Sequence, residues 1–322
     1  YVSRFKKIKI GLIGETIIDQ YVFGEIIGKS GKEPHLVMRH EKKNNYLGGV
    51  CAIANNLSVF SDSVSLVSIL GNNKSENSFI NKGLSKNIKK HFVTNPSSAN
   101  IVKIRFIDSV SHKKMLGLYQ IDDKIISKKE EIKIIAILKK ILKKTQLLII
   151  SDYGHGLFTE KIAKVLMSSK KIAFLNAQVN ASNHGYHSLL KYQNVNFVII
   201  NENELRHEMR NKSDSIECLA KKIIVKRNIN SIVVTRGNSG SFMLRNNGKI
   251  TYCPAFASKV VDKVGAGDAM LALIALCQKN NLADDLTLFI SSFGSAISVE
   301  NFANNYKLES SSFLRRIESM LK

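Results

Sequence analysis

Short apolar runs of five to nine residues alternate along this chain with longer stretches in which apolar residues recur every three or four positions. The runs are typical of strands buried in a parallel sheet, and they lie at 8–14, 63–71, 147–154, 172–176, 197–202 and 231–237. The longer stretches predict amphipathic or buried helices at 132–143, 160–168, 215–227, 269–277, 285–300 and 310–321. This alternation predicts an α/β fold whose mainly parallel central sheet carries helices on both faces.

Two segments, about 21–47 and 101–122, break this pattern. Within the second, "IVKIRFID" and "KKMLGLYQID" alternate apolar and polar residues, which favours a half-buried antiparallel sheet. We interpret the two segments as a small β lid over one edge of the main sheet. The chain has only three prolines and no internal repeat, so residues 8–322 are expected to form one domain with this lid. Because the chain begins with Tyr1 rather than Met, residues 1–7 are expected to be a leader or linker from a longer chain.

The charge is strongly positive, with 48 Lys and Arg against 26 Asp and Glu, a net charge of +22. Only ten of these basic residues are Arg, and the lysines are spread along the chain, as on the polar face of "KKEEIKIIAILKKILKK". There is no helix-turn-helix, zinc-finger or aromatic–basic motif. We therefore expect no specific nucleic-acid partner and interpret the charge as a general attraction for anionic substrates.

The four cysteines lie far apart and form no CxxC pair, which argues against a disulfide framework or a zinc cluster. Cysteines used in this way are typical of a reducing compartment. No apolar run reaches the roughly 18 residues that a membrane-spanning helix needs. We therefore expect a cytoplasmic protein without a membrane partner.

Polar residues gather where several predicted strands stop. The first strand leads into Glu15 and Asp19, and the others end at 151–154, 201–204 and 235–237. In an open parallel sheet, ligands bind beyond the carboxyl ends of the strands. Each cluster alone is weak, because loops are polar, but together they predict one common site at this edge.

The stretch "DKVGAGDAM", at 262–270, leads into the most apolar predicted helix. In one interpretation its glycines form a tight turn and Asp268 only caps the helix. In the other, the first backbone N–H groups are left for an anion and the carboxylate faces a substrate. A second glycine pair, Gly48 and Gly49, permits either a close approach to a polyhydroxylated ligand or a simple turn. The chain has neither a Walker phosphate loop nor a G-x-G-x-x-G motif after its first strand.

These motifs resemble those of the ribokinase-like (PfkB) carbohydrate kinases over essentially the whole chain. "KVGAGDA" is similar to the C-terminal signature of that family, "VVTRGNSG" to its strand and turn beside the nucleotide, and "NENE" to its N-x-x-E element. "GETIIDQYVFGE", "YLGG" and "ISDYGHG" resemble the heptose-phosphate kinase branch, which makes a sugar bisphosphate. In that branch the kinase is often fused to a nucleotidyltransferase.

The resemblance implies a kinase that uses ATP and Mg²⁺ to phosphorylate a hydroxyl of a sugar or sugar phosphate. It implies that Asp268 is the general base, and that an anion hole is formed by Gly265, Ala266 and Gly267. The implied nucleotide-binding residues are Asn201, Glu202, Asn203, Glu204, Thr235, Gly237 and Gly240. Asn201 and Glu204 would act on the metal through phosphates or water, although Glu204 could instead only favour the dipole of a helix that begins there.

On the substrate side the candidates are Asp19, Gly48, Gly49 and Asp152, with Lys103 and Arg105 on the lid as anion contacts. Asp19 could instead be a loop carboxylate, and the two lid cations could be solvated strand residues. The family analogy adds a monovalent cation as a further cofactor, a homodimer through the lid sheets, and a fused or associated nucleotidyltransferase as a partner.

Three departures from the family pattern fall on the sugar side. Ala52 stands where an Asn usually follows the double glycine, His155 replaces a Lys of the heptose kinases, and the run from Asn176 replaces Asp-Pro-Lys-Gly. The sugar therefore stays open, and a nucleoside or fructose phosphate is an alternative substrate. A different alternative is a non-catalytic sugar- or nucleotide-binding module that regulates a fused partner.

Overall fold

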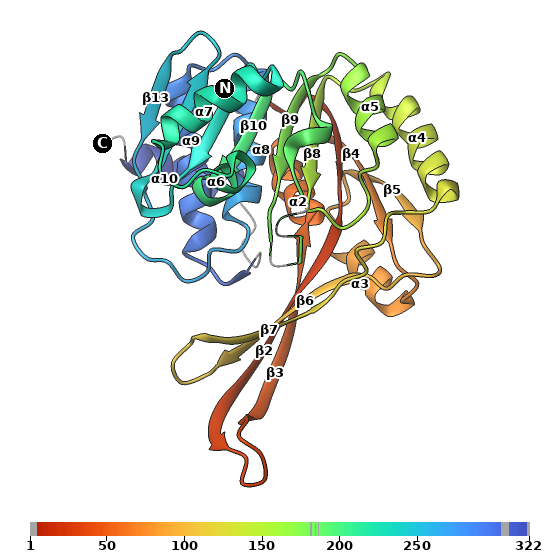
Figure 1. Ribbon diagram of the computed structural model, residues 1–322, viewed down its shortest axis with the longest axis vertical. Coiled ribbons are helices and arrows are strands. Elements are labelled where there is room, and N and C mark those ends of the chain that lie inside the picture. Colours follow the sequence, from red (N-terminus) through yellow and green to blue (C-terminus); the bar gives the residue numbers. More distant parts are fainter. Residues whose placement is uncertain (1–4, 181, 184, 186, 304–308, 321–322) are drawn as a thin grey trace.

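The main sheet has nine strands, in the order β13-β12-β11-β10-β9-β8-β1-β4-β5 (Figure 1). The structure is a computed structural model, and it describes residues 5–180, 182–183, 185, 187–303 and 309–320. Seven neighbouring strands of this described part run parallel: β1 (Lys9–Gly14), β4 (Ser63–Leu70), β5 (Ile88–Thr94), β8 (Leu147–Asp152), β9 (Ile172–Ala177), β10 (Phe197–Asn201) and β11 (Ser231–Thr235). The edge is completed by antiparallel β12 (Ser241–Arg245) and β13 (Ile250–Cys253).

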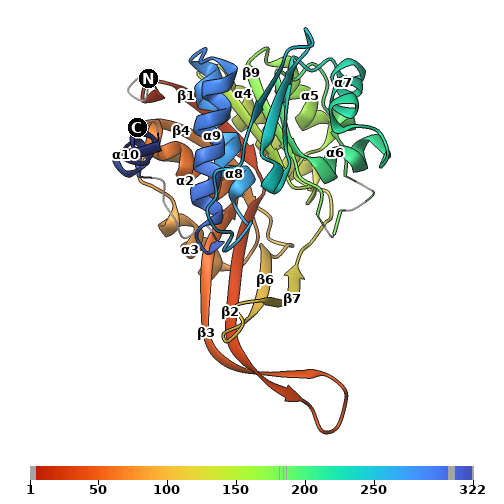
Figure 2. The same cartoon turned by 90° about the vertical axis from the view of Figure 1, so that its left-hand side faces the viewer.

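Helices cover both faces of this sheet, as Figure 2 shows. One face carries α2 (Val50–Phe60), α8 (Ala266–Lys279), α9 (Asp284–Val299) and α10 (Ser310–Met320). The other carries α4 (Lys128–Leu142), α5 (Glu160–Ser168), α6 (Glu202–Met209) and α7 (Ile216–Arg227). A further helix, α3 (Lys74–Gly83), lies between β4 and β5 in the chain. The predicted α/β fold class is confirmed.

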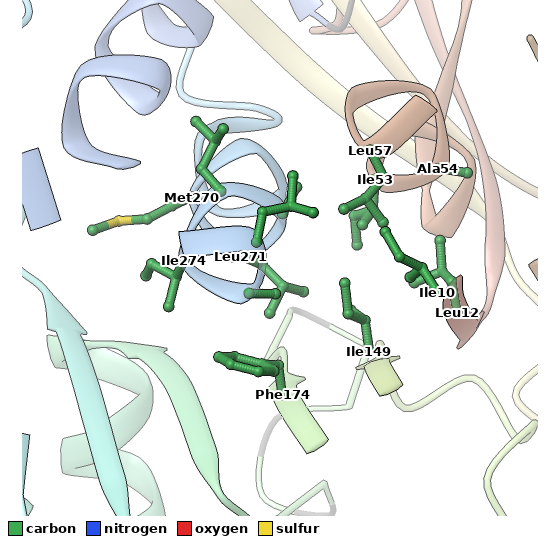
Figure 3. Close-up of a cluster of buried hydrophobic side chains, with 14 of the residues drawn as sticks. Ile10, Leu12, Ile53, Ala54, Leu57, Ile149, Phe174, Met270, Leu271 and Ile274 are labelled. Carbon is green, nitrogen blue, oxygen red and sulfur yellow. The ribbon is translucent and has the colours of Figure 1, made fainter. Parts of the chain in front are cut away.

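Successive side chains of a buried strand point to opposite faces of the sheet, so the core has two layers. On β1, Ile10 and Leu12 join the layer under α2 and α8, whereas Ile13 joins the layer under the helices of the opposite face. Figure 3 shows the first layer, in which Ile149 and Phe174 approach Leu271 and Ile274 of α8. The ring of Phe174 stacks on Phe197 with centroids 4.5 Å apart. Helix α8 is thus held along its length by the centre of the sheet.

The packed core also includes Phe5, which is 2% exposed and contacts Phe60 edge-to-face with ring centroids 6.5 Å apart. The expected leader at 1–7 therefore contains a core residue, and the packed part begins before residue 8. Residues 1–4 of that expected leader and Leu321 of the last predicted helix lie outside the described residues.

A second sheet of four strands begins where β1 ends and projects away from the main body (Figures 1 and 2). Its strand order is β3-β2-β6-β7, and we call it the projecting sheet; its strands are β2 (Thr16–Lys29), β3 (Leu36–Gly49), β6 (Ile101–Asp108) and β7 (Lys114–Gln120). The predicted antiparallel sheet is wrong in one pair, because β2 and β6 run parallel. The half-buried pattern expected of 114–120 is also wrong, since every residue of β7 is exposed.

We predict that Phe174→Ala lowers the free energy of unfolding by about 3–5 kcal/mol, because it removes a stacked ring from a close-packed layer and leaves a cavity. Urea denaturation followed by circular dichroism measures this loss. The matched control is Val225→Ala on α7, where the side chain is 83% exposed, so the change is expected to stay within about 0.5 kcal/mol. Equal midpoints for the two variants would contradict the packing described here.

Candidate functional site

The first turn of α8 presents backbone N–H groups without an acceptor. Gly265 precedes the helix with φ 87°, a left-handed conformation that glycine adopts without strain. Within the described part of the chain, no acceptor is found for the N–H groups of Gly265, Ala266 or Gly267. A Cβ atom added at Gly267 would meet open space. The turn therefore has the chemistry of an anion-binding site at a helix N-terminus.

Asp268 lies on this first turn, partly buried. Its Oδ1 accepts a hydrogen bond of 2.7 Å from the Tyr153 hydroxyl. The residue in the capping position is Gly265, and no side chain caps the helix there, so the interpretation of Asp268 as a simple N-cap is not supported. Burial raises the pKa of Asp268 to about 6, while the Tyr153 hydrogen bond and Lys103 oppose the rise. A carboxylate of this kind is suited to accept a proton near neutral pH.

Two residues that were not among the predicted site residues position the Asp268 carboxylate. Tyr153 contacts it directly, and Glu15 acts through Tyr153. Tyr153 is 3% exposed and follows β8, and its backbone N–H donates 2.9 Å to Glu15 Oε2. Glu15 follows β1, is fully buried, and also accepts from the His155 N–H at 3.2 Å. Burial and the neighbouring Asp152 raise the pKa of Glu15 to about 8. The only sequence signal for both was their place at strand ends.

Asp19 and Arg105 form a buried pair on the projecting sheet, with 2.6 Å between Arg105 Nη1 and Asp19 Oδ1. Asp19 is on β2 rather than in a loop, and it is 3% exposed. Lys103 neighbours both of them, is 6% exposed, and has no ion-pair partner among the described residues. Its Nζ lies 5.7 Å from the ring centre of Tyr119 and 6.0 Å from that of Tyr153. Burial lowers the pKa of Lys103, and Asp19 opposes this shift.

Tyr153 connects Asp268 with the charged residues of the projecting sheet. Its hydroxyl donates to Asp268, and its ring lies beside Lys103, which neighbours Asp19 and Arg105. The two cations are not solvated strand residues, because both are largely buried. Arg105 is paired with Asp19, whereas Lys103 forms no ion pair among the described residues.

Gly48 and Gly49 allow other residues of the protein to pack closely against the backbone. A Cβ atom at Gly48 would collide with Asp19 Oδ2, and one at Gly49 would collide with the carbonyl oxygen of Glu15. Gly49 also has φ 55° and precedes α2, whose first N–H, from Val50, donates to the same Glu15 carbonyl. The pair thus lets β3 and α2 pass close to Asp19 and Glu15.

The prediction that Asp152 contacts substrate needs correction. Its carboxylate is 1% exposed and already accepts from the Tyr192 hydroxyl at 2.8 Å, Lys191 Nζ at 2.8 Å and the Gly154 N–H at 2.9 Å. It therefore holds the loop after β8 in place. The nearby His155, one of the departures from the family pattern, pairs its Nδ1 with Asp123 Oδ1 at 2.8 Å.

On the nucleotide side, Asn201 and Glu204 form a capping box at the start of α6. The Asn201 N–H donates 3.0 Å to Glu204 Oε2, and the Glu204 N–H donates 2.9 Å to Asn201 Oδ1. Burial raises the pKa of Glu204 to about 7. Both side chains are engaged, and no group of three or more metal-binding side chains occurs among the described residues, so the two do not fit direct metal ligation. Their predicted action through phosphates or water stays a prediction.

The other predicted nucleotide residues divide into two groups. Asn203 is exposed, Thr235 pairs with Asn201 across β10 and β11, and a Cβ atom at Gly237 would meet open space. These three line the strand ends beside α6. By contrast, Glu202 is paired with Arg206 at 2.9 Å and with Arg236 at 3.4 Å. At Gly240 an added Cβ atom would collide with the carbonyl oxygen of Cys253, and its predicted contact with the nucleotide stays a prediction.

Solved structures with this fold include phosphofructokinase-2 from Escherichia coli in complex with substrates and products. It shares 14% identity with this chain, with a TM-score of 0.78 over 98% of this chain and 99% of that one. A ribokinase from Thermotoga maritima shares 16% identity, with a TM-score of 0.72 over 96% of this chain and 99% of that one. The fold is therefore ribokinase-like.

The family follows from the sequence match. The model of the pfkB family of carbohydrate kinases matches residues 7–299, and the chain belongs to this family. It is a sugar kinase.

No helix in the described part of the chain is long and apolar enough to cross a membrane.

The curated relatives include bifunctional proteins named HldE. The one from Paramagnetospirillum magneticum is 26% identical over 281 residues, which is 85% of this chain and 57% of that protein. The one from Haemophilus influenzae strain PittEE is 24% identical over 302 residues, which is 93% of this chain and 61% of that protein. The chain thus spans less than two thirds of these relatives.

We predict that Tyr153→Phe moves the acid limb of kcat/KM to higher pH. Activity that needs ionised Asp268 is lost as pH falls through its pKa, and the Tyr153 hydrogen bond lowers that pKa. Removing the hydroxyl therefore raises the pKa, while Asp19 and Lys103 stay in place. The control is Tyr119→Phe, which removes a hydroxyl from the other ring beside Lys103. An acid limb that is the same in both variants and the wild type would contradict the assignment.

Proposed function

We propose that this protein transfers the γ-phosphoryl group of ATP to a hydroxyl of a sugar or sugar phosphate, with Asp268 as general base. The observation that carries the proposal is the first turn of α8, where a partly buried carboxylate follows directly on N–H groups for which the described residues provide no acceptor. Phosphoryl transfer depends on positioning and charge stabilisation, and this turn supplies both an anion site and a proton acceptor.

The geometry supports the following roles. Gly265, Ala266 and Gly267 would donate to the transferring phosphoryl group, assisted by the dipole of α8. Asp268 would accept the proton of the attacking hydroxyl, and Tyr153 would orient it. The open surface at Asn203, Thr235 and Gly237 would take the nucleotide. Magnesium would enter with the phosphates and neutralise their charge, with Asn201 and Glu204 nearby.

On the acceptor side, Lys103 is the cation available for a phosphate on the sugar, and Asp19 is the carboxylate beside it. The motifs similar to the heptose-phosphate kinase branch support a heptose phosphate as the acceptor. Ala52 is buried in α2 and has no polar side chain, and Asn176 Nδ2 donates to the Ile199 carbonyl at 2.9 Å. The same branch supports a nucleotidyltransferase as a fused or associated partner. A monovalent cation and a cytoplasmic location are further parts of the proposal.

The projecting sheet would act as the lid of this site. Segments 21–47 and 101–122 supply most of it, and it carries Asp19, Lys103 and Arg105 at its base. A sheet that closes when sugar binds would exclude water, which otherwise competes for the phosphoryl group. The whole of 8–322 would then work as one kinase domain with this lid.

The projecting sheet would also join two copies into a homodimer. Its edge strand β7 exposes Leu116 at 62% and Leu118 at 54%, and the period of a strand puts these two on one face. We predict that Leu118→Glu converts a dimer to a monomer in sedimentation velocity, because it places a charge in an apolar interface. The control is Leu190→Glu, which changes a leucine outside the projecting sheet that is 62% exposed. A wild type that sediments as a monomer would exclude the dimer.

We predict that Asp268→Asn lowers sugar phosphorylation by about 10²- to 10⁴-fold, the usual contribution of a general base. The amide keeps the shape and still accepts from Tyr153, so nucleotide affinity and melting temperature are expected to change little. The measurement is transfer of label from [γ-³²P]ATP to a heptose phosphate, fructose 6-phosphate, ribose and a nucleoside.

The matched control is Asp285→Asn, which removes an exposed carboxylate from the first turn of α9. It is expected to keep full activity. If the wild type transfers label to no acceptor in the panel, the catalytic proposal fails and the non-catalytic binding module is favoured. If Asp268→Asn melts early but keeps its turnover, the residue has a structural role only.

A further inference from the structure

Asp262 connects the projecting sheet to the loop that leads into α8. Its side chain is buried, at 2% exposure, three residues before Gly265. Oδ2 accepts from the Tyr21 hydroxyl on β2 at 2.5 Å, and Oδ1 accepts from Lys114 Nζ on β7 at 2.5 Å. We call Tyr21, Lys114 and Asp262 the Asp262 cluster. The two strands lie in the projecting sheet (Figure 2), so one carboxylate contacts both.

The same carboxylate shapes the turn before the anion site. Its Oδ1 accepts from the Val264 N–H at 3.1 Å, and its Oδ2 accepts from the Ala303 N–H at 3.3 Å. Burial alone would raise the pKa of Asp262, but the hydrogen bonds from Lys114, Tyr21 and the Val264 N–H outweigh it, and the pKa lies below its usual range. The carboxylate is therefore ionised and fully engaged. Val264 is the residue directly before Gly265, so the position of Asp262 constrains the turn.

Tyr21 links this cluster to the substrate side. Its ring is fully buried and lies edge-to-face with Tyr46 and Phe302. The Arg105 guanidinium lies 5.4 Å from the ring centre of Tyr21, and Arg105 is the partner of Asp19. A continuous set of contacts thus runs from Asp19 through Arg105 and Tyr21 to Asp262 and the turn of α8.

We propose that Lys114 is a positioning residue, which acts through Asp262 to hold the projecting sheet against the α8 turn and so sets the position of its anion-binding N–H groups. The inference rests on the proposed function, because it assigns the turn to the phosphoryl group. It explains why Lys114, on an exposed edge strand, extends its side chain to the fully buried carboxylate of Asp262. It also gives a lid movement a direct route to the groups that would stabilise the transferring phosphoryl.

Lys114 is the member of the cluster best suited to a test. Its side chain is 40% exposed, so Lys114→Met removes the charge without opening the core. Asp262 keeps Tyr21 and two backbone N–H donors in this variant. Lys114→Arg keeps a cation at the same place, and Lys113→Met removes the neighbouring, exposed lysine as a matched control.

The first measurement is hydrogen exchange of the peptide covering 262–268, which needs no sugar. We expect exchange in Lys114→Met to be about ten-fold faster than in the wild type, because the Val264 hydrogen bond opens more often. Lys114→Arg is expected to restore slow exchange, and Lys113→Met to match the wild type. Equal exchange in all four proteins would overturn the proposal.

The second measurement is turnover with [γ-³²P]ATP and a heptose phosphate. We expect kcat to fall about 10- to 100-fold in Lys114→Met, the scale of a small misplacement of catalytic groups, with little change in the KM for ATP. A rise in KM alone, with kcat unchanged, would mean that Lys114 only binds a ligand and would overturn the positioning role. A wild type without turnover on any sugar would contradict the proposed function, while the exchange comparison would still decide on the cluster.

Discussion

The site depends on the hydrogen bonds of the buried Glu15 side chain. It stands at the end of β1, where the chain leaves the main sheet and enters the projecting one. Its two oxygens hold the N–H groups of Tyr153 and His155, and its backbone carbonyl receives the first N–H of α2. Tyr153 then reaches Asp268. A group buried in this way is stable only when it is hydrogen-bonded, so the loops after β1 and β8 and the start of α2 are fixed together.

The sheet and its helices could be predicted because buried parallel strands are short apolar runs and their helices are periodic. Strands β5, β12 and β13 were not predicted. Each lies toward an edge of the sheet and mixes polar residues with apolar ones, so its pattern is weaker. The parallel pairing of β2 with β6 was also missed, because alternation along a strand records which residues are buried but not the direction of the neighbouring strand.

The candidate site was predicted unevenly for a similar reason. The residues of the turn at Gly265–Asp268 are consecutive in the sequence, so Asp268 and its neighbouring glycines could be predicted together. Glu15 and Tyr153 are 138 residues apart, and Tyr153 and Asp268 are 115 apart, so only the fold shows that they touch. For Gly48 the sequence left a ligand contact and a simple turn open, and only the fold shows that Asp19 takes the space beside its α-carbon. Asp152 was chosen for its charge, and the fold surrounds it with donors.

Burial is the largest influence on the charge state of Lys103, and the carboxyl groups around it oppose that influence. Asp19 and Arg105 neutralise each other, and Asp268 is hydrogen-bonded to Tyr153. Lys103 is buried as well: its Nζ lies over the rings of Tyr119 and Tyr153 and forms no ion pair among the described residues, although Asp19, Glu15 and Asp268 are close enough to favour its ammonium form. Burial of an ammonium group is costly, and it lowers the pKa of Lys103 even though these carboxyl groups oppose the shift. An anionic group on a bound ligand would add to the charges that favour the ammonium form of Lys103, and this is the physical basis for proposing a phosphorylated acceptor.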